Sequence, residues 1–131
     1  MLGSCLCGSI QYRVNEFEPN IANCHCSMCR KSSGAAFATF AGVKPENFTW
    51  LKGESHIKVY ESSEVAERGF CEKCGSSLFY KVKGNNTGYE IALGTLDEEP
   101  NHKPNANIYC SYKAQWPTNS EQLKEYKEGR G

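Results

Sequence analysis

The chain has 131 residues, of which 15 are Lys or Arg and 15 are Asp or Glu, so its formal net charge at neutral pH is zero. A chain so balanced produces no long-range field for nucleic acid or for an acidic membrane surface, and we expect neither as a partner. No apolar run approaches the roughly 20 residues that a transmembrane helix needs. Residues 1–4 lead to the first cysteine without the basic and apolar regions of a signal peptide, so we expect a reduced, cytoplasmic protein.

In chain order, the predicted elements are mostly short strands. Alternating polar and apolar side chains, or brief apolar runs, occur at residues 9–14, 35–40, 56–60, 68–70, 77–82, 89–93 and 106–109. Gly, Pro and Asn residues between these segments indicate turns. Helical pattern is limited to residues 26–33 and the polar C-terminal end. We predict one mainly β domain over residues 1–117 and a polar tail over residues 118–131, with Phe37 and Trp116 as core aromatic side chains.

Seven of the eight cysteines fall into three short clusters. The clusters are Cys5 and Cys7, then Cys24, Cys26 and Cys29, then Cys71 and Cys74. Two cysteines separated by one or two residues can share one metal ion, and tetrahedral sulfur sites usually hold zinc or an iron–sulfur cluster. Seven thiolates make one closed site of four and one open site of three. An open position distinguishes a catalytic zinc from a structural one.

Two other interpretations of the cysteines stay open at this point. A disulfide framework would suit a small secreted protein, but a disulfide within Cys-x-Cys is strained and the clusters hold an odd number of cysteines. Alternatively, His25 or Cys110 completes the second zinc site, which makes the protein a zinc-stabilised binding module without catalysis. His25 points away from its neighbours in an extended segment, and we expect Cys110 to be a lone buried thiol.

The cysteine clusters and their flanking residues resemble the glutathione-dependent formaldehyde-activating enzyme family, also called the centromere protein V family. The resemblance is carried by residues 4–10, 24–34 and 68–78, with weaker matches at 94–97 and 111–116, and it covers residues 3–117. It implies a complex of short, coiled antiparallel sheets stapled by two zinc ions. The structural zinc would be held by Cys5, Cys7, Cys71 and Cys74. The catalytic zinc would be held by Cys24, Cys26 and Cys29.

The family resemblance also implies a reaction. A zinc ion with three thiolates is a poor activator of water but suits a fourth thiol. The family chemistry is a carbon–sulfur lyase reaction run in the synthetic direction, in which the glutathione thiol attacks formaldehyde to give S-hydroxymethylglutathione. Arg30, Lys31 and Arg68 are candidates for contacts with glutathione. The chain departs from the family pattern at Asn107, where histidine is common, and at Gln115, where proline is usual.

Overall fold

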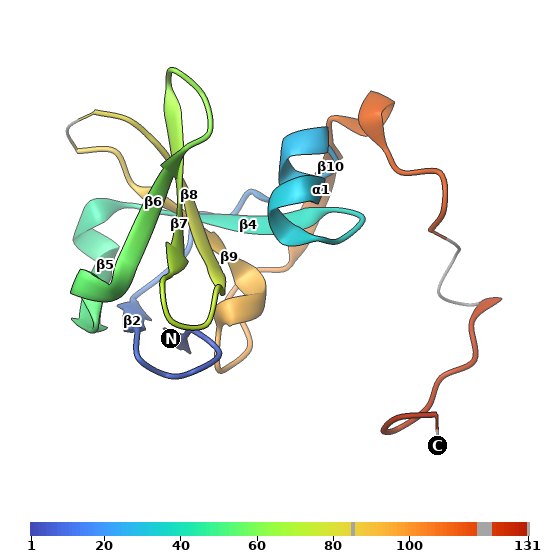
Figure 1. Ribbon diagram of the computed structural model, residues 1–131, viewed down its shortest axis with the longest axis horizontal. Helices are drawn as coiled ribbons and strands as arrows, with labels where there is room; N and C mark the ends of the chain where they lie inside the picture. The colour runs from blue at the N-terminus through green and yellow to red at the C-terminus, as the bar shows by residue number, and fades with distance from the viewer. Residues whose placement is uncertain (85, 118–121, 131) are drawn as a thin grey trace.

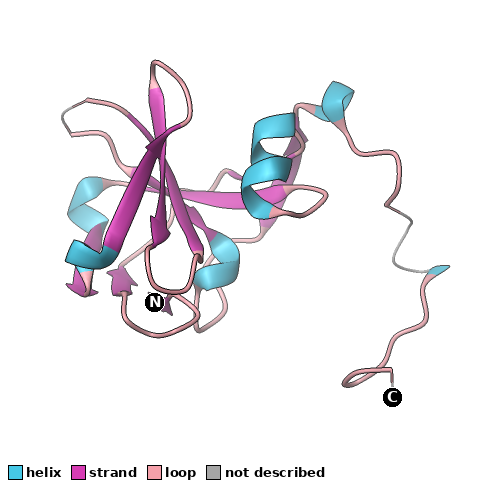
Figure 2. Cartoon of the chain, in the orientation of Figure 1, coloured by secondary structure: helices cyan, strands magenta, loops and turns pink. Residues whose placement is uncertain are grey.

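The computed structural model describes residues 1–84, 86–117 and 122–130. Strands dominate it, and a single α-helix and four short 3-10 turns complete the described elements (Figure 2). The strands are β1 Leu2–Ser4, β2 Gln11–Val14, β3 Ile21–Cys24, β4 Ala38–Val43, β5 Phe48–Lys52, β6 Ile57–Glu61, β7 Ala66–Cys71, β8 Ser77–Val82, β9 Tyr89–Ala92 and β10 Pro104–Ile108. The helices are α1 Ser27–Ser33, η1 Pro45–Asn47, η2 Glu54–His56, η3 Leu93–Thr95 and η4 Cys110–Tyr112. The predicted mainly β fold is confirmed.

The strands form two sheets. A three-stranded sheet has the order β1-β2-β5, and a seven-stranded sheet has the order β10-β3-β4-β9-β8-β7-β6. All neighbouring strands are antiparallel except β10 and β3, which are parallel. Helix α1 lies beside β4 and β10, at the end of the large sheet away from β5 and β6 (Figure 1).

The core contains a cluster of aromatic rings. The Tyr12 ring is fully buried and stacks on Phe48 with ring centroids 5.5 Å apart. The Trp50 ring packs edge-on against Phe48 with ring centroids 4.7 Å apart, and its centroid lies 6.0 Å from that of Phe79. Tyr12 and Trp50 belong to the small sheet, and Phe79 belongs to the large sheet. The contact between Trp50 and Phe79 therefore joins the two sheets, and burial of these apolar rings stabilises the contact.

Two expected core side chains lie elsewhere. Trp116 is 69% exposed and Phe37 is 40% exposed, so the prediction that both are core aromatics is wrong. Phe37 precedes β4 and packs on the ring of His25 with centroids 5.0 Å apart. Trp116 follows η4 and belongs to no strand of the two sheets.

The predicted boundary at residue 117 stays a prediction. The polar tail expected over residues 118–131 includes 118–121 and 131, which lie outside the described residues. Within 122–130 the structure has no α-helix. Among the described residues, no helix has the length and apolar character needed to cross a membrane.

Candidate metal centres and the adjoining pocket

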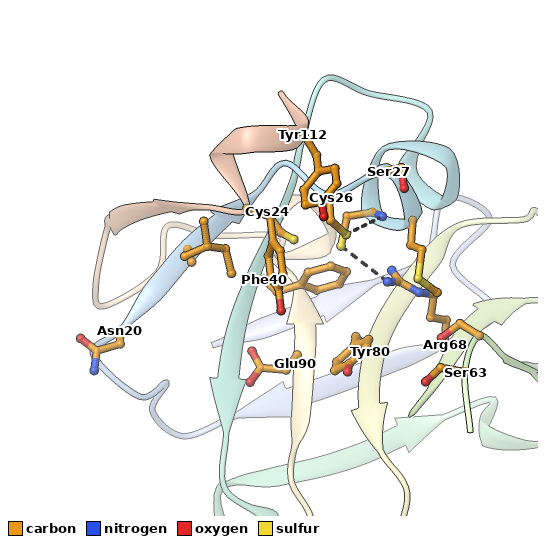
Figure 3. A pocket seen from close by; sticks show the side chains of 16 residues that line it. Asn20, Cys24, Cys26, Ser27, Phe40, Ser63, Arg68, Tyr80, Glu90 and Tyr112 are labelled. Carbon is orange, nitrogen blue, oxygen red and sulfur yellow. Dashed lines mark hydrogen bonds between the residues drawn. The ribbon is translucent and has the colours of Figure 1, made fainter. Parts of the chain in front are cut away.

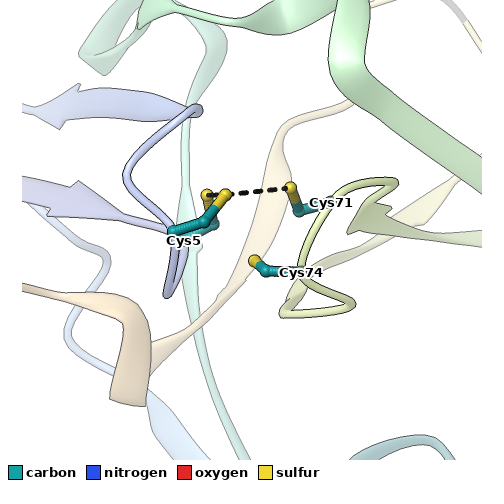
Figure 4. A group of neighbouring side chains, drawn as sticks. Cys5, Cys71 and Cys74 are labelled. Atoms are coloured by element: carbon teal, nitrogen blue, oxygen red, sulfur yellow. Dashed lines mark hydrogen bonds between the residues drawn. The ribbon is translucent and has the colours of Figure 1, made fainter.

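The first candidate metal centre joins the N-terminal end of the chain to the turn between β7 and β8. The sulfur atoms of Cys5, Cys7, Cys71 and Cys74 all lie within 4.8 Å of one another (Figure 4). The Cys5 and Cys7 sulfurs are 3.6 Å apart, and those of Cys7 and Cys71 are 3.9 Å apart. Four thiolates placed tetrahedrally at the usual Zn–S bond length have sulfurs about 3.8 Å apart. The spacing therefore fits one zinc-sized ion with four sulfur ligands.

Each turn of this four-cysteine group ends in a glycine in the left-handed conformation. Gly8 follows Cys7 with φ 77°, and Gly75 follows Cys74 with φ 77°. The Gly8 N–H donates to the Cys5 carbonyl at 3.0 Å, and the Gly75 N–H donates to the Cys71 carbonyl at 2.8 Å. Glycine populates this left-handed conformation without a steric penalty, so it closes each turn while both sulfurs face the same side.

Hydrogen bonds surround the sulfurs of the four-cysteine group. The backbone N–H of Ile10 donates to the Cys5 sulfur at 3.3 Å, and the Ser76 hydroxyl lies 3.2 Å from the Cys74 sulfur. The hydrogen bond with Ser76 lowers the pKa of the Cys74 thiol. Donors aimed at sulfur favour the thiolate, which is the form that binds a metal ion.

The second candidate metal centre is formed where β3 passes into α1. Cys24 ends β3, and the Cys26 sulfur caps α1 by accepting a hydrogen bond from the Cys29 backbone N–H at 3.3 Å. Because a strand turns directly into a helix here, the sulfurs of Cys24, Cys26 and Cys29 come within 4.8 Å of one another. Cys24 and Cys29 are buried, and burial raises the pKa of the Cys24 thiol. This three-cysteine group could also hold a metal ion.

The remaining candidates for the second site lie outside it. Of the described residues, neither His25 nor Cys110 has a ligand atom within 4.8 Å of all three sulfurs. The buried His25 ring instead contacts the Asn107 side-chain oxygen through Nε2 at 3.3 Å. Cys110 is exposed, so the expectation of a buried thiol is wrong, and its thiol donates to the Asn107 carbonyl at 3.4 Å.

A pocket of about 700 Å³ adjoins the three-cysteine group. One face of the large sheet forms its floor, and α1 and the segment after β10 form its walls (Figure 3). Its lining residues are Asn20, Ala22, Cys24, Cys26, Ser27, Met28, Cys29, Phe40, Ser62, Ser63, Arg68, Tyr80, Glu90, Ile108, Tyr109 and Tyr112. A mostly apolar cleft of this size with a few polar groups is typical of a small-molecule site.

Arg68 connects the pocket floor to the three-cysteine group. Its Nη2 atom donates to the Cys29 sulfur at 3.5 Å (Figure 3), and its guanidinium carbon lies 5.2 Å from the centroid of the Tyr80 ring. The Arg68 Nε and Nη1 atoms are buried and find no hydrogen-bond partner among the described residues. Arg68 therefore brings positive charge to the thiols.

The two other cations that the sequence suggested have different positions. Lys31 is exposed and lines a second groove, which shares Arg68 with the pocket. Arg30 lines neither cavity, and its Nε atom is buried without a hydrogen-bond partner among the described residues. Tyr80 and Glu90 could not be identified as pocket residues from the sequence, because a single polar residue in a strand carries no functional signal of its own.

The comparisons with known proteins identify the family of the chain and agree with its fold. The family model described as glutathione-dependent formaldehyde-activating enzyme matches residues 1–112, so the chain belongs to that family, as the sequence analysis predicted. An uncharacterised lyase of Schizosaccharomyces pombe is 30% identical over 89 residues, which are 68% of this chain and 63% of the relative. A Halomonas elongata protein, provisionally named a glutathione-dependent formaldehyde-activating enzyme, is 31% identical over 83 residues, or 59% of this chain and 53% of the relative. The chain thus spans between about half and two thirds of the length of these curated relatives.

A solved structure has the same fold. The crystal structure of a Rhodobacter sphaeroides protein superposes with a TM-score of 0.64 at 22% identity, covering 77% of this chain and 92% of that chain. At this identity the likeness concerns the arrangement of the strands alone.

Proposed function

We propose that the chain is a zinc-dependent enzyme of the carbon–sulfur lyase type that adds the thiol of glutathione to formaldehyde and forms S-hydroxymethylglutathione. The observation that supports this most is a three-sulfur group that adjoins a pocket. Among the described residues, no fourth His, Cys, Asp or Glu atom joins the sulfurs of Cys24, Cys26 and Cys29. A catalytic zinc site keeps one such position for its substrate.

The two cysteine groups would have different roles. The four-cysteine group, Cys5, Cys7, Cys71 and Cys74, would hold a structural zinc, because four sulfurs leave no position for a substrate. Cys24, Cys26 and Cys29 would hold the second zinc ion, whose charge would favour the deprotonated form of a substrate thiol at neutral pH. Three thiolates make a weak activator of water, so we propose thiol chemistry here and not hydrolysis.

Arg68 would balance the charge of the incoming thiolate. Its guanidinium contacts the Cys29 sulfur at 3.5 Å, and the guanidinium carbon lies over the Tyr80 ring, 5.2 Å from the ring centroid. The thiolate sulfur would then attack the formaldehyde carbon, and the carbonyl oxygen would take up a proton equivalent to the one that the thiol lost. The apolar side chains of Met28, Phe40 and Ile108 line the pocket beside the three-cysteine group.

The proposed compartment is the cytoplasm. All eight cysteines are free thiols in the structure, including the closely spaced pairs. Thiols persist in reducing compartments, and a thiolate metal site needs them reduced.

The experiment that tests the proposal measures catalysis directly. Glutathione and formaldehyde are mixed at neutral pH with the zinc-loaded protein, and the rate of adduct formation is measured by exchange NMR. We expect a rate above the uncatalysed one. Cys29→Ser should abolish the excess rate, whereas Cys110→Ser should keep it, because that exposed thiol lies outside both groups.

The same experiment separates the proposal from its alternative. If the zinc-loaded protein gives no excess rate, the proposed reaction is wrong and a zinc-stabilised binding module without catalysis becomes the better description. S-methylglutathione, which cannot form a thiolate, should bind much more weakly than glutathione. Equal binding of the two would contradict coordination through sulfur.

A further inference from the structure

The pocket floor carries a carboxylate, that of Glu90 on β9. Glu90 lines the pocket together with Phe40 and Tyr80. Among the described residues, it takes part in no salt bridge and its carboxylate accepts no hydrogen bond. A carboxylate in a cavity is stabilised by an opposite charge, so this one is available to a ligand.

The one cationic side chain that lines the same pocket does not neutralise Glu90. Along the sheet, Glu90 of β9 is paired with Tyr80 of β8, and Tyr80 is paired with Arg68 of β7. Tyr80 therefore stands between the two charges, and the Arg68 guanidinium reaches the Cys29 sulfur instead (Figure 3). The positive charge of Arg68 therefore lies at the thiols, and the negative charge of Glu90 lies apart from it on the pocket floor.

The surroundings of the Glu90 carboxylate leave it accessible from the pocket. Its partner on β4 is Gly42, and the Glu90 Oε1 atom lies 3.4 Å from the position that a Cβ atom at Gly42 would occupy. The carboxylate thus lies beside the backbone of Gly42, which has no side chain to cover it. Water reaches it through the mouth of the pocket, but the protein around it still raises its pKa by desolvation. A bound cation would relieve that penalty.

The distance to the thiols restricts the ligand. Cys24 is paired with Ala38 on β4, and Glu90 is paired with Gly42 on the same strand. Two strand spacings and four residues of strand length place the Cα atoms of Cys24 and Glu90 about 17 Å apart. A ligand whose thiol lies at the three-cysteine group can therefore contact Glu90 only if many bonds separate its cationic group from its sulfur.

We infer that Glu90 binds the ammonium group of a thiol substrate in which a peptide-like arm separates the ammonium from the sulfur. This inference rests on the proposed function and states which thiol substrates the site would prefer. Glutathione has this form, because the α-ammonium of its γ-glutamyl arm lies many bonds from the sulfur. Cysteine carries its ammonium close to its sulfur and cannot place both groups at once.

The experiment compares two thiols on three proteins by calorimetry. Glutathione and N-acetylglutathione, which lacks the ammonium, are titrated into zinc-loaded wild-type protein, Glu90→Gln and the control Glu67→Gln. Glu67 lies on β7 next to Arg68 in sequence, so its side chain faces the other side of the sheet. We expect N-acetylation to weaken binding about tenfold for wild type and for the control, a loss typical of one charged hydrogen bond. For Glu90→Gln the two thiols should bind alike.

Each outcome bears on a different claim. If wild type binds both thiols equally while catalysing formaldehyde addition, the assignment of Glu90 is wrong and the proposed function stands. If wild type binds neither thiol, both are wrong. Equal binding of the two thiols by wild type would overturn the inference even if Glu90→Gln does not fold. Wild-type discrimination that persists in Glu90→Gln would place the ammonium at another residue and overturn the inference.

Discussion

Removing two ligands from the four-cysteine group should destabilise the fold more than removing two from the three-cysteine group. The Cys7 and Cys71 sulfurs join positions 64 residues apart in the chain. By the chain-entropy relation for cross-links, closing a loop of that length contributes about 4 kcal/mol to the free energy of unfolding. The three-cysteine group spans only Cys24 to Cys29, for which the same relation gives about 2 kcal/mol.

The comparison uses two matched double variants, Cys71→Ser with Cys74→Ser and Cys26→Ser with Cys29→Ser. Each pair removes one buried and one half-buried thiol, so the cost of burying serine hydroxyls is similar in both. We expect the first variant to lose about 2 kcal/mol more than the second.

The free energies come from urea unfolding of the zinc-loaded proteins, followed by far-ultraviolet circular dichroism and extrapolated linearly to water. The control is Cys110→Ser, which should unfold like wild type, because Cys110 is exposed and outside both groups. Equal losses in the two double variants, or a larger loss from the Cys26 and Cys29 pair, would refute the loop-closure reasoning.

Three further outcomes are expected. Mass spectrometry under native conditions should find two zinc ions per chain, with a chelator removing the three-cysteine zinc first, and a single ion would contradict the division into two sites. Gly69→Ala should lower the free energy of unfolding by about 1–3 kcal/mol, since overpacking strains a core; a Cβ atom there would lie 2.3 Å from Phe79 Cε1. Gly94→Ala, with no atom within 4 Å, is the control in thermal unfolding, and equal melting temperatures would contradict the clash. Burial raises the pKa of Tyr12 from 10.0 to about 12. The folded state therefore holds the Tyr12 proton more tightly than the unfolded state does. The resulting contribution to the free energy of unfolding is fully present below pH 10 and is lost as the pH rises to about 12. Tyr12→Phe should reduce the loss of unfolding free energy over that pH range by about 3 kcal/mol, measured by urea unfolding at several pH values. An unchanged pH dependence in the variant would contradict the role of Tyr12.

The sequence predicted those parts of the fold that have a local pattern. Residues 77–82 include the brief apolar run Leu78–Tyr80 beside the third cysteine cluster, and β8 has the same bounds. Strand β3 was missed because its four residues include Asn23 and a cysteine that indicated a metal-binding loop. The parallel pairing of β3 with β10 joins segments more than 80 residues apart, and no periodicity in either segment specifies a partner at that distance. Strands β1 and β5, also missed, are short edge strands of the small sheet.

The candidate site was predictable to the extent that its chemistry is local. Cys24, Cys26 and Cys29 are close in sequence, so their spacing alone indicated a shared metal ion. Glu90 and Arg68 become parts of one pocket only because β7, β8 and β9 are neighbours in the sheet. A composition-based expectation also failed for Trp116, because an aromatic side chain in itself does not specify which surface will cover it.

Strand β10 has a consequence for how copies of this protein meet at high concentration. It ends the large sheet, and an exposed edge strand is a template for pairing with another chain. Every residue of β10 is exposed, but Pro104 lacks an N–H donor and the pairing register shifts between Pro104 and Ala106. These two irregularities interrupt the row of hydrogen-bonding groups that a second sheet would need. The strand beside the three-cysteine group therefore also protects its own edge of the large sheet against edge-to-edge aggregation.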